Sequence, residues 1–156
     1  MTKMAWQQLP LARKEGLVVE ELPDEVLIYD EDRNKAHCLN QTAALIWKYC
    51  DGQTSVEGVA SLLERELKTP VKEEVIWFAL DQLGKYHLLQ KPIVRPSEMP
   101  KFSRRELVKK LGLAASVPLI FSILAPEASA ALSCVGNSCP KGTCQGSCVC
   151  VGGKCQ

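Results

Sequence analysis

Short runs of apolar and β-branched positions mark the early part of the chain. Residues 17–22 and 25–30 form two such runs, joined at Pro23-Asp24, a dipeptide suited to a tight turn. A polar loop at residues 31–34 leads to a third run at residues 35–39. The pattern predicts a three-stranded antiparallel meander, and we expect its third strand to lie at the edge of the sheet.

The apolar positions then change to the 3.6-residue period of amphipathic helices. Asn40 can cap a first helix, which stops at Asp51-Gly52. Residues 54–57, Thr-Ser-Val-Glu, have the form of a capping box for a second helix. A third helix, residues 71–85, carries one apolar stripe made of Ile76, Ala79, Leu80 and Leu83. The predicted fold class is therefore α+β, a three-stranded antiparallel sheet followed by three helices.

A different pattern begins near residue 100. Five cations lie within residues 101–110, an uncharged apolar stretch follows at residues 111–125, and Ala128-Ser129-Ala130 comes next. A basic region, an apolar region and a small-x-small cleavage site are the three parts of a secretory signal. The 15 apolar residues fall short of the roughly 20 that span a bilayer. We expect a hydrophobic signal helix with cleavage after Ala130; a short membrane anchor and a basic-apolar helix packed on the domain are the alternatives.

Cysteine is concentrated at the end of the chain. Six of the eight cysteines lie in the last 23 residues, with spacing C-x4-C-x4-C-x3-C-x-C-x4-C and glycine-rich loops. This density is typical of an oxidising compartment and predicts a small disulfide-rich tail. Residues 151–154, Val-Gly-Gly-Lys, predict a tight hairpin. Spacing alone leaves 15 pairings open, and a zinc site and thioether crosslinks remain alternatives.

These patterns divide the chain into four parts: a domain at 1–92, a proline-rich linker at 93–102, the signal segment at 103–130 and the tail at 131–156. Residues 1–100 hold 12 Lys and Arg against 16 Asp and Glu, net −4, which disfavours nucleic-acid binding. HExxH, GxSxG, P-loop and CxxC motifs are missing from the domain, so we expect no enzyme activity, cofactor or metal there. Met99 offers an alternative start that would place the signal at an N-terminus.

The domain resembles a known family. Residues 39–47, Leu-Asn-Gln-Thr-Ala-Ala-Leu-Ile-Trp, then Asp51-Gly52 and the closing Leu88-Leu89 are similar to the pyrroloquinoline quinone biosynthesis protein D (PqqD) family over residues 11–92. The resemblance implies a winged-helix-like peptide-binding domain, also called the RiPP recognition element. Such a domain holds the leader of a precursor peptide and presents it to a modifying enzyme, often a radical S-adenosylmethionine maturase.

In that family the leader lies between the third strand and the third helix. An open strand edge can add a peptide as one more strand. The resemblance thus implies a peptide-binding groove made by Lys35, Ala36, His37, Cys38, Leu39, Ile76, Ala79, Leu80 and Leu83. For any single one of these apolar residues, a place in the core is the simpler interpretation.

Two further resemblances concern the second half of the chain. Residues 103–109, Ser-Arg-Arg-Glu-Leu-Val-Lys, resemble a twin-arginine signal, with Arg104 and Arg105 as the specific pair. This implies the twin-arginine export machinery as a partner, a cytoplasmic domain and a tail that is exported or membrane-associated. The tail resembles an inhibitor cystine knot, which implies the pairs Cys134 with Cys148, Cys139 with Cys150 and Cys144 with Cys155.

Together these features indicate a leader-recognition domain fused to its own substrate. The bound peptide would be a precursor, with the chain's own tail as one option. A stand-alone peptide chaperone, and an exported cystine-knot effector or inhibitor with the domain as a holder, are the competing interpretations. A DNA-binding winged helix is a distant fourth.

Overall fold

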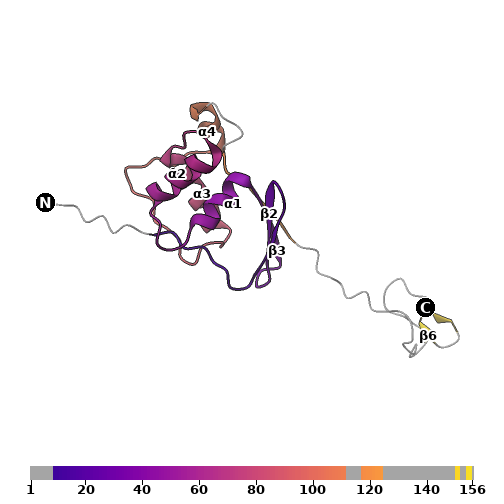
Figure 1. Ribbon diagram of the computed structural model, residues 1–156. Helices are drawn as coiled ribbons and strands as arrows, with labels where there is room; N and C mark the ends of the chain where they lie inside the picture. The colour runs from indigo at the N-terminus through magenta and orange to yellow at the C-terminus, as the bar shows by residue number, and fades with distance from the viewer. Residues whose placement is uncertain (1–8, 112–116, 125–149, 152–153, 156) are drawn as a thin grey trace. The chain divides into compact units, whose positions relative to one another are not determined.

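The computed structural model describes residues 9–111, 117–124, 150–151 and 154–155 (Figure 1). The chain divides into two compact units, Met1–Leu124 and Ala125–Gln156. The elements of the first unit are β1 (Leu17–Glu21), β2 (Glu25–Asp30), β3 (Lys35–Asn40), α1 (Gln41–Tyr49), α2 (Val56–Leu67), α3 (Glu73–Lys85), α4 (Arg104–Leu111) and β4 (Ile120–Leu124).

The predicted meander of β1, β2 and β3 is present, but β3 is not an edge strand. β4 pairs antiparallel with β3, so the sheet has the order β1-β2-β3-β4. Leu39 lies opposite Ile120, and Lys35 lies opposite Leu124. The expectation of an open edge was wrong because a distant, β-branched part of the same chain supplies the partner for the free backbone groups of β3.

The three predicted helices are confirmed, with small shifts at their ends. Asn40 caps α1. The cap of α2 is Ser55, whose Oγ accepts from the Gly58 N–H at 3.2 Å, rather than Thr54. The Thr54 hydroxyl is engaged with Asp51 instead, at 3.0 Å, so the helix starts one residue later than the capping-box pattern predicted. α1, α2 and α3 gather on one side of the sheet (Figure 1).

The core lies between these helices and the sheet. Its largest fully buried side chains come from both layers, and they include Ile28, Leu39, Ile46, Leu63, Ile76 and Leu83. Burial of branched aliphatic side chains is worth about 1.5–3 kcal/mol each, which makes this layer the main source of stability. Cys50 also lies in it, as a buried thiol without a disulfide.

The predicted signal helix is not seen over residues 117–124, the part of the apolar stretch after Leu111 that the structure describes. The helix α4 is formed by the basic segment, while residues 120–124 of the apolar stretch are extended as β4. Ser103 and Glu106 make a capping box at the start of α4, with the Ser103 N–H donating to Glu106 Oε2 at 2.7 Å. In α4 the alternative of a basic-apolar helix packed on the domain is the one observed, because Leu107 is fully buried against Phe78 of α3.

Among the described residues, no helix is both long and apolar enough to span a membrane. The segment between α3 and α4 lies on the domain: the Arg95 guanidinium pairs with Asp81 of α3 and donates to the Pro100 carbonyl at 2.6 Å.

In the second unit the structure describes one pair of strands. β5 (Cys150–Val151) and β6 (Lys154–Cys155) pair antiparallel, with Val151 opposite Lys154. The predicted hairpin is confirmed. The predicted disulfides and the cleavage site at Ala128 and Ala130 lie outside the part of the chain that the structure describes.

Candidate functional site

The candidate site is the side of β3 that pairs with β4, together with the neighbouring surface of α3 and α4. β3 alternates along its length, with His37 and Leu39 buried and Lys35 exposed. The four α3 residues predicted for the groove are all buried: Ile76, Ala79, Leu80 and Leu83. Ile120 of β4 belongs to the same apolar cluster as these four and Leu39. The apolar residues predicted for the groove therefore lie in the buried core of the domain, and Ile120 of the chain's own β4 lies in the same core.

We call residues 117–124 the docked segment. Its first part is inserted, with Val117 1% and Ile120 7% exposed. Its second part lies on the outside, with Phe121 57%, Ile123 65% and Leu124 74% exposed. Buried side chains therefore hold the first part of the docked segment on the domain, whereas the second part is held by strand pairing with β3.

Val117 occupies an apolar subsite of its own. It packs with Phe78 of α3 and Leu107 of α4, and Phe102 and Val108 line the margin. Lys110 of α4 also forms an ion pair with Glu74 of α3 at 3.6 Å, which links the two helices. The subsite is thus built by the docked α4 as well as by α3.

Asn40 connects the docked segment to α1. Its Oδ1 accepts from the Ala43 N–H at 3.0 Å as the helix cap, and from the Leu119 N–H at 2.9 Å. Its Nδ2 donates to the Val117 carbonyl at 3.0 Å. Its backbone N–H donates to the Leu119 carbonyl at 3.0 Å. Sequence reasoning identified Asn40 only as a cap; the unused hydrogen-bonding capacity of the amide was the available signal.

A buried charged cluster lies beneath the other end of β3. Asp30 is fully buried and pairs with Arg13 at 2.7 Å and Arg33 at 3.3 Å. Burial alone raises the pKa of Asp30, but the two guanidinium groups outweigh it and hold the pKa below the usual value.

His37 is buried next to this cluster, with its ring 5.4 Å from that of Tyr86. Neither ring nitrogen has a hydrogen-bond partner among the described residues. Burial lowers the pKa of His37; Asp30 opposes this shift, and Lys35, Arg13 and His87 add to it. The ring is therefore neutral at physiological pH.

Cys38 faces a different environment from Cys50. Its Sγ donates to Glu25 Oε2 at 2.9 Å, and burial followed by the Glu25 carboxylate raises the pKa of the thiol to about 11. The thiol is thus protonated at neutral pH and a poor nucleophile.

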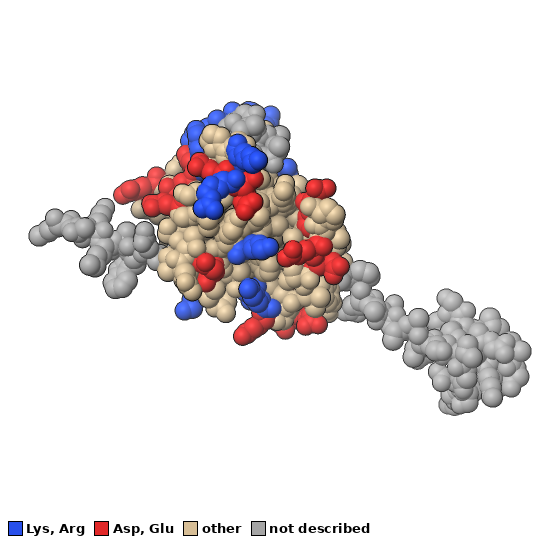
Figure 2. All heavy atoms as spheres, viewed as in Figure 1, with Lys and Arg blue, Asp and Glu red and all other residues tan. Residues whose placement is uncertain are grey.

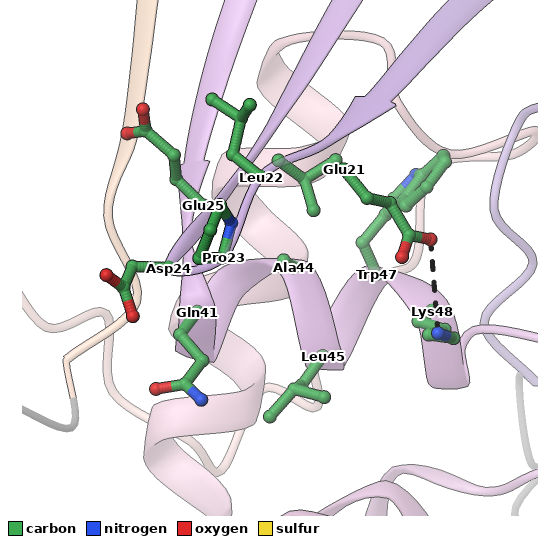
Figure 3. A pocket seen from close by; sticks show the side chains of 11 residues that line it. Glu21, Leu22, Pro23, Asp24, Glu25, Gln41, Ala44, Leu45, Trp47 and Lys48 are labelled. Carbon is green, nitrogen blue, oxygen red and sulfur yellow. Dashed lines mark ion pairs between the residues drawn. The ribbon is translucent and has the colours of Figure 1, made fainter.

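A separate pocket of about 200 Å³ lies between the β1–β2 turn and α1 (Figure 3). Its acidic side chains are Glu21, Asp24 and Glu25, and its apolar wall includes Leu45 and Trp47. None of the predicted groove residues lines it. Within the described ranges, no cluster of three or more His, Cys, Asp or Glu could hold a metal ion. Figure 2 shows acidic and basic side chains intermixed on the face in view.

The family model of coenzyme PQQ synthesis protein D (PqqD) matches residues 25–89, within the span expected from the resemblance. No curated protein and no solved structure matches the chain. Members of this family are non-catalytic chaperones, and the family implies binding of a precursor peptide and a modifying enzyme. From β2 through α3 to Leu89, this part of the chain is a PqqD family domain.

Proposed function

We propose that the PqqD domain binds the docked segment of its own chain and so presents the cysteine-rich tail to a peptide-modifying enzyme, such as a radical S-adenosylmethionine maturase. The observation that carries the proposal is the pairing of β4 with β3. A peptide added to a sheet edge gains main-chain hydrogen bonds for affinity, and pockets for alternate side chains give specificity. Here Val117 and Ile120 are the side chains so placed.

Covalent connection favours this arrangement. Only five residues, 112–116, separate α4 from the docked segment. A short connection gives an effective concentration in the millimolar range, so a segment with weak intrinsic affinity stays bound. A leader on another molecule would have to displace it.

Chain length limits where the enzyme would act. Nine residues, 125–133, lie between Leu124 and Cys134, the first cysteine of the tail, so that Cys134 is ten steps along the chain from Leu124. Fully extended, that stretch covers at most about 35 Å. The first modified residue would therefore lie within this distance of the end of β4.

The same segment carries the export-like pattern, and we propose that binding and export compete for it. A secretory signal needs a continuous apolar region. In the domain, part of that region is paired as β4 while Leu107 and Val117 are buried. Release of the docked segment would free the signal next to the exposed Arg104 and Arg105, leaving the domain in the cytoplasm and directing the tail outward.

A second candidate function is favoured by the tail, where six cysteines and the β5–β6 hairpin fit a small cross-linked peptide. Under it, the tail is an exported cystine-knot effector or inhibitor and the domain a holder. The intact mass of the mature tail separates the two. Three disulfides remove about six hydrogens and are reversed by a thiol reductant, whereas thioether crosslinks resist it.

The experiment for the leading proposal uses a matched pair of full-length variants, Ile120→Asp and Ile123→Asp. Both place a carboxylate in β4, but only the first places it at a buried position. Hydrogen exchange of residues 35–40 and 117–124 should accelerate strongly in Ile120→Asp and stay near wild type in Ile123→Asp. Unchanged exchange in both variants would contradict docking of the segment.

The functional part of the test measures the intact mass of the tail after expression of the same variants in the native host. Loss of the mass change in Ile120→Asp, with normal modification of Ile123→Asp, is the expected result. Full modification of the tail in both variants would show that presentation in cis is not required.

A further inference from the structure

The contacts of Asn40 go beyond what a helix cap requires. Asn, Asp and Ser are about equally good at the N-cap position, because each supplies one acceptor oxygen. The Val117 carbonyl, however, needs a donor, and it receives one from Asn40 Nδ2 at 3.0 Å. Aspartate has no such donor, and a serine hydroxyl on a shorter side chain cannot serve three partners. The residue type therefore matches the docked segment rather than α1.

The hydrogen bonds that join Asn40 to the docked segment go to backbone atoms of the segment. The Val117 carbonyl, the Leu119 N–H and the Leu119 carbonyl all bond to it, two through the side chain and one through the main chain. Main-chain contacts of this kind recognise an extended backbone whatever its side chains. They fix the position along the segment at which the side chains meet their subsites.

Pro118 lies between these contacts and is buried. It has no N–H, so its burial leaves no orphan donor. It also restricts the preceding residue to extended conformations. Val117 is therefore held extended before binding, which lowers the conformational entropy lost on docking.

The side-chain subsite lies outside the PqqD domain in part. Val117 is enclosed by Phe78 of α3 and by Leu107 of α4. α4 begins at Arg104, beyond the residues 25–89 that match the family. This chain thus adds its own wall to the groove. A branched aliphatic side chain fits the subsite, and a charged one would be desolvated without a partner.

We infer that Asn40 and the subsite between α3 and α4 form a recognition site for one class of peptide: an extended segment reading aliphatic, proline, any residue, then β-branched aliphatic. In this chain that sequence is Val117-Pro118-Leu119-Ile120. The inference rests on the proposed function, because it names what the groove selects. It adds that the site discriminates among leaders, and that α4 and Asn40 supply the discrimination.

The first test measures hydrogen exchange of residues 117–124 in the full chain. Asn40→Asp keeps the cap and the acceptor for Leu119 but loses the donor to Val117; Asn40→Ser keeps the cap and loses both side-chain contacts. We expect exchange to accelerate about 10-fold in the first and by a further severalfold in the second. Ser55→Ala is the matched control, since it removes the cap of α2, whose hydroxyl accepts from Gly58 of its own helix. Equal acceleration of hydrogen exchange in all three variants would mean that Asn40 acts only as a helix cap.

The second test asks which peptide the opened groove takes. The full-length Ile120→Asp chain is titrated with a fluorescent peptide of residues 115–126 and with versions carrying Val117→Asp or Pro118→Ala. We expect the Val117→Asp peptide to bind at least 30-fold more weakly, and the Pro118→Ala peptide about 3-fold more weakly. In the Ile120→Asp, Leu107→Ala double variant, the native peptide should lose about 10-fold in affinity.

The outcomes separate the two claims. If no peptide binds and the exchange of residues 35–40 is unchanged by Ile120→Asp, the proposed function itself fails. If the native peptide binds but both altered peptides bind equally well, the groove is a peptide site without the discrimination inferred here, and only this inference is overturned.

Discussion

The two halves of the docked segment differ in how they are held. Residues 117–120 insert Val117 and Ile120 into apolar subsites and bond to Asn40, whereas residues 121–124 keep their large side chains mostly in solvent. Both halves belong to one apolar stretch of the sequence. Hydrophobicity alone therefore does not select the binding residues. The binding residues are instead selected by the apolar subsites and by the side-chain amide of Asn40, which face residues 117–120.

The largest difference between the two halves of the docked segment is expected when a charged residue is placed in each. Val117→Asp should lower the free energy of unfolding by about 3 kcal/mol, because the burial of Val117 and the bonds to Asn40 are lost together. Ile123→Asp should stay within about 0.5 kcal/mol of wild type, as most exposed substitutions do. Urea denaturation of the full chain measures both. Equal losses would mean that the two halves are held alike.

The wall of the Val117 subsite offers a second, smaller perturbation. Leu107→Ala should cost about 2 kcal/mol, since it opens a cavity beside Val117 and Phe78. Val108→Ala, next to it and only half-buried, should cost about 1 kcal/mol or less. Hydrogen exchange should accelerate in residues 117–120 of the first variant only. A uniform acceleration over the whole domain would indicate general destabilisation instead.

Acid should weaken the sheet next to residues 121–124 of the docked segment, where His37 of β3 lies opposite Ser122 of β4. Burial holds the pKa of His37 below its ordinary value of 6.5. Near that pH the unfolded chain binds more protons than the folded one. The contribution of neutral His37 to the free energy of unfolding is therefore present above about pH 6.5 and is lost as the pH falls further. Unfolding free energies measured between about pH 8 and 5 should decline in wild type and less in His37→Leu.

A second variant for that titration is His87→Asn. His87 is exposed and has a φ of 58°, a conformation that asparagine tolerates. Because His87 adds to the lowering of the His37 pKa, its replacement should make the decline of stability with acid somewhat shallower than in wild type, and steeper than in His37→Leu. A decline that persists fully in His37→Leu would assign the pH dependence to other groups.

The smallest effect on stability is expected at the arginine pair. Arg104 and Arg105 are exposed at the start of α4, so changing both to lysine should alter the unfolding free energy by less than about 0.5 kcal/mol. The proposal nevertheless expects export of the tail to stop, because the paired arginines are the specific part of the resemblance. Fractionation of cells expressing the two chains would measure it. Continued release of the tail from the double-lysine variant would contradict the assignment of residues 103–109 as a twin-arginine signal.

Much of the domain could be predicted because its signals are local. Apolar and β-branched runs and the turn at Pro23-Asp24 predicted the meander. The first helix was also predicted, but α1 ends at Tyr49 with Cys50 as its cap, short of the expected Asp51-Gly52, although Gly52 does have a positive φ of 77°. The cap of α2 was displaced by one residue because Thr54 bonds to Asp51, a competition that a capping pattern does not include.

The docked segment could not be predicted in the same way. A short apolar run fits a strand as well as a helix, and periodicity does not separate the two. Its conformation is decided by pairing with β3, about 80 residues earlier in the chain. Asn40 shows the same limit: its role at α1 is local and was predicted, whereas its bonds to Val117 and Leu119 depend on that long-range pairing.

The central claim, that this chain's own segment pairs with β3 in a fixed register, is tested most directly by a cross-strand disulfide. Cys38 lies opposite Phe121, and directly opposed residues of antiparallel strands share one face at a spacing that a disulfide can bridge. Because the pKa of the Cys38 thiol is raised to about 11, oxidation is run at about pH 9 to supply thiolate. Peptide mapping should find a Cys38 link in Phe121→Cys and none in Ser122→Cys, whose side chain points to the other face. No link in either variant, or equal links in both, would contradict the register and with it the docking of the segment.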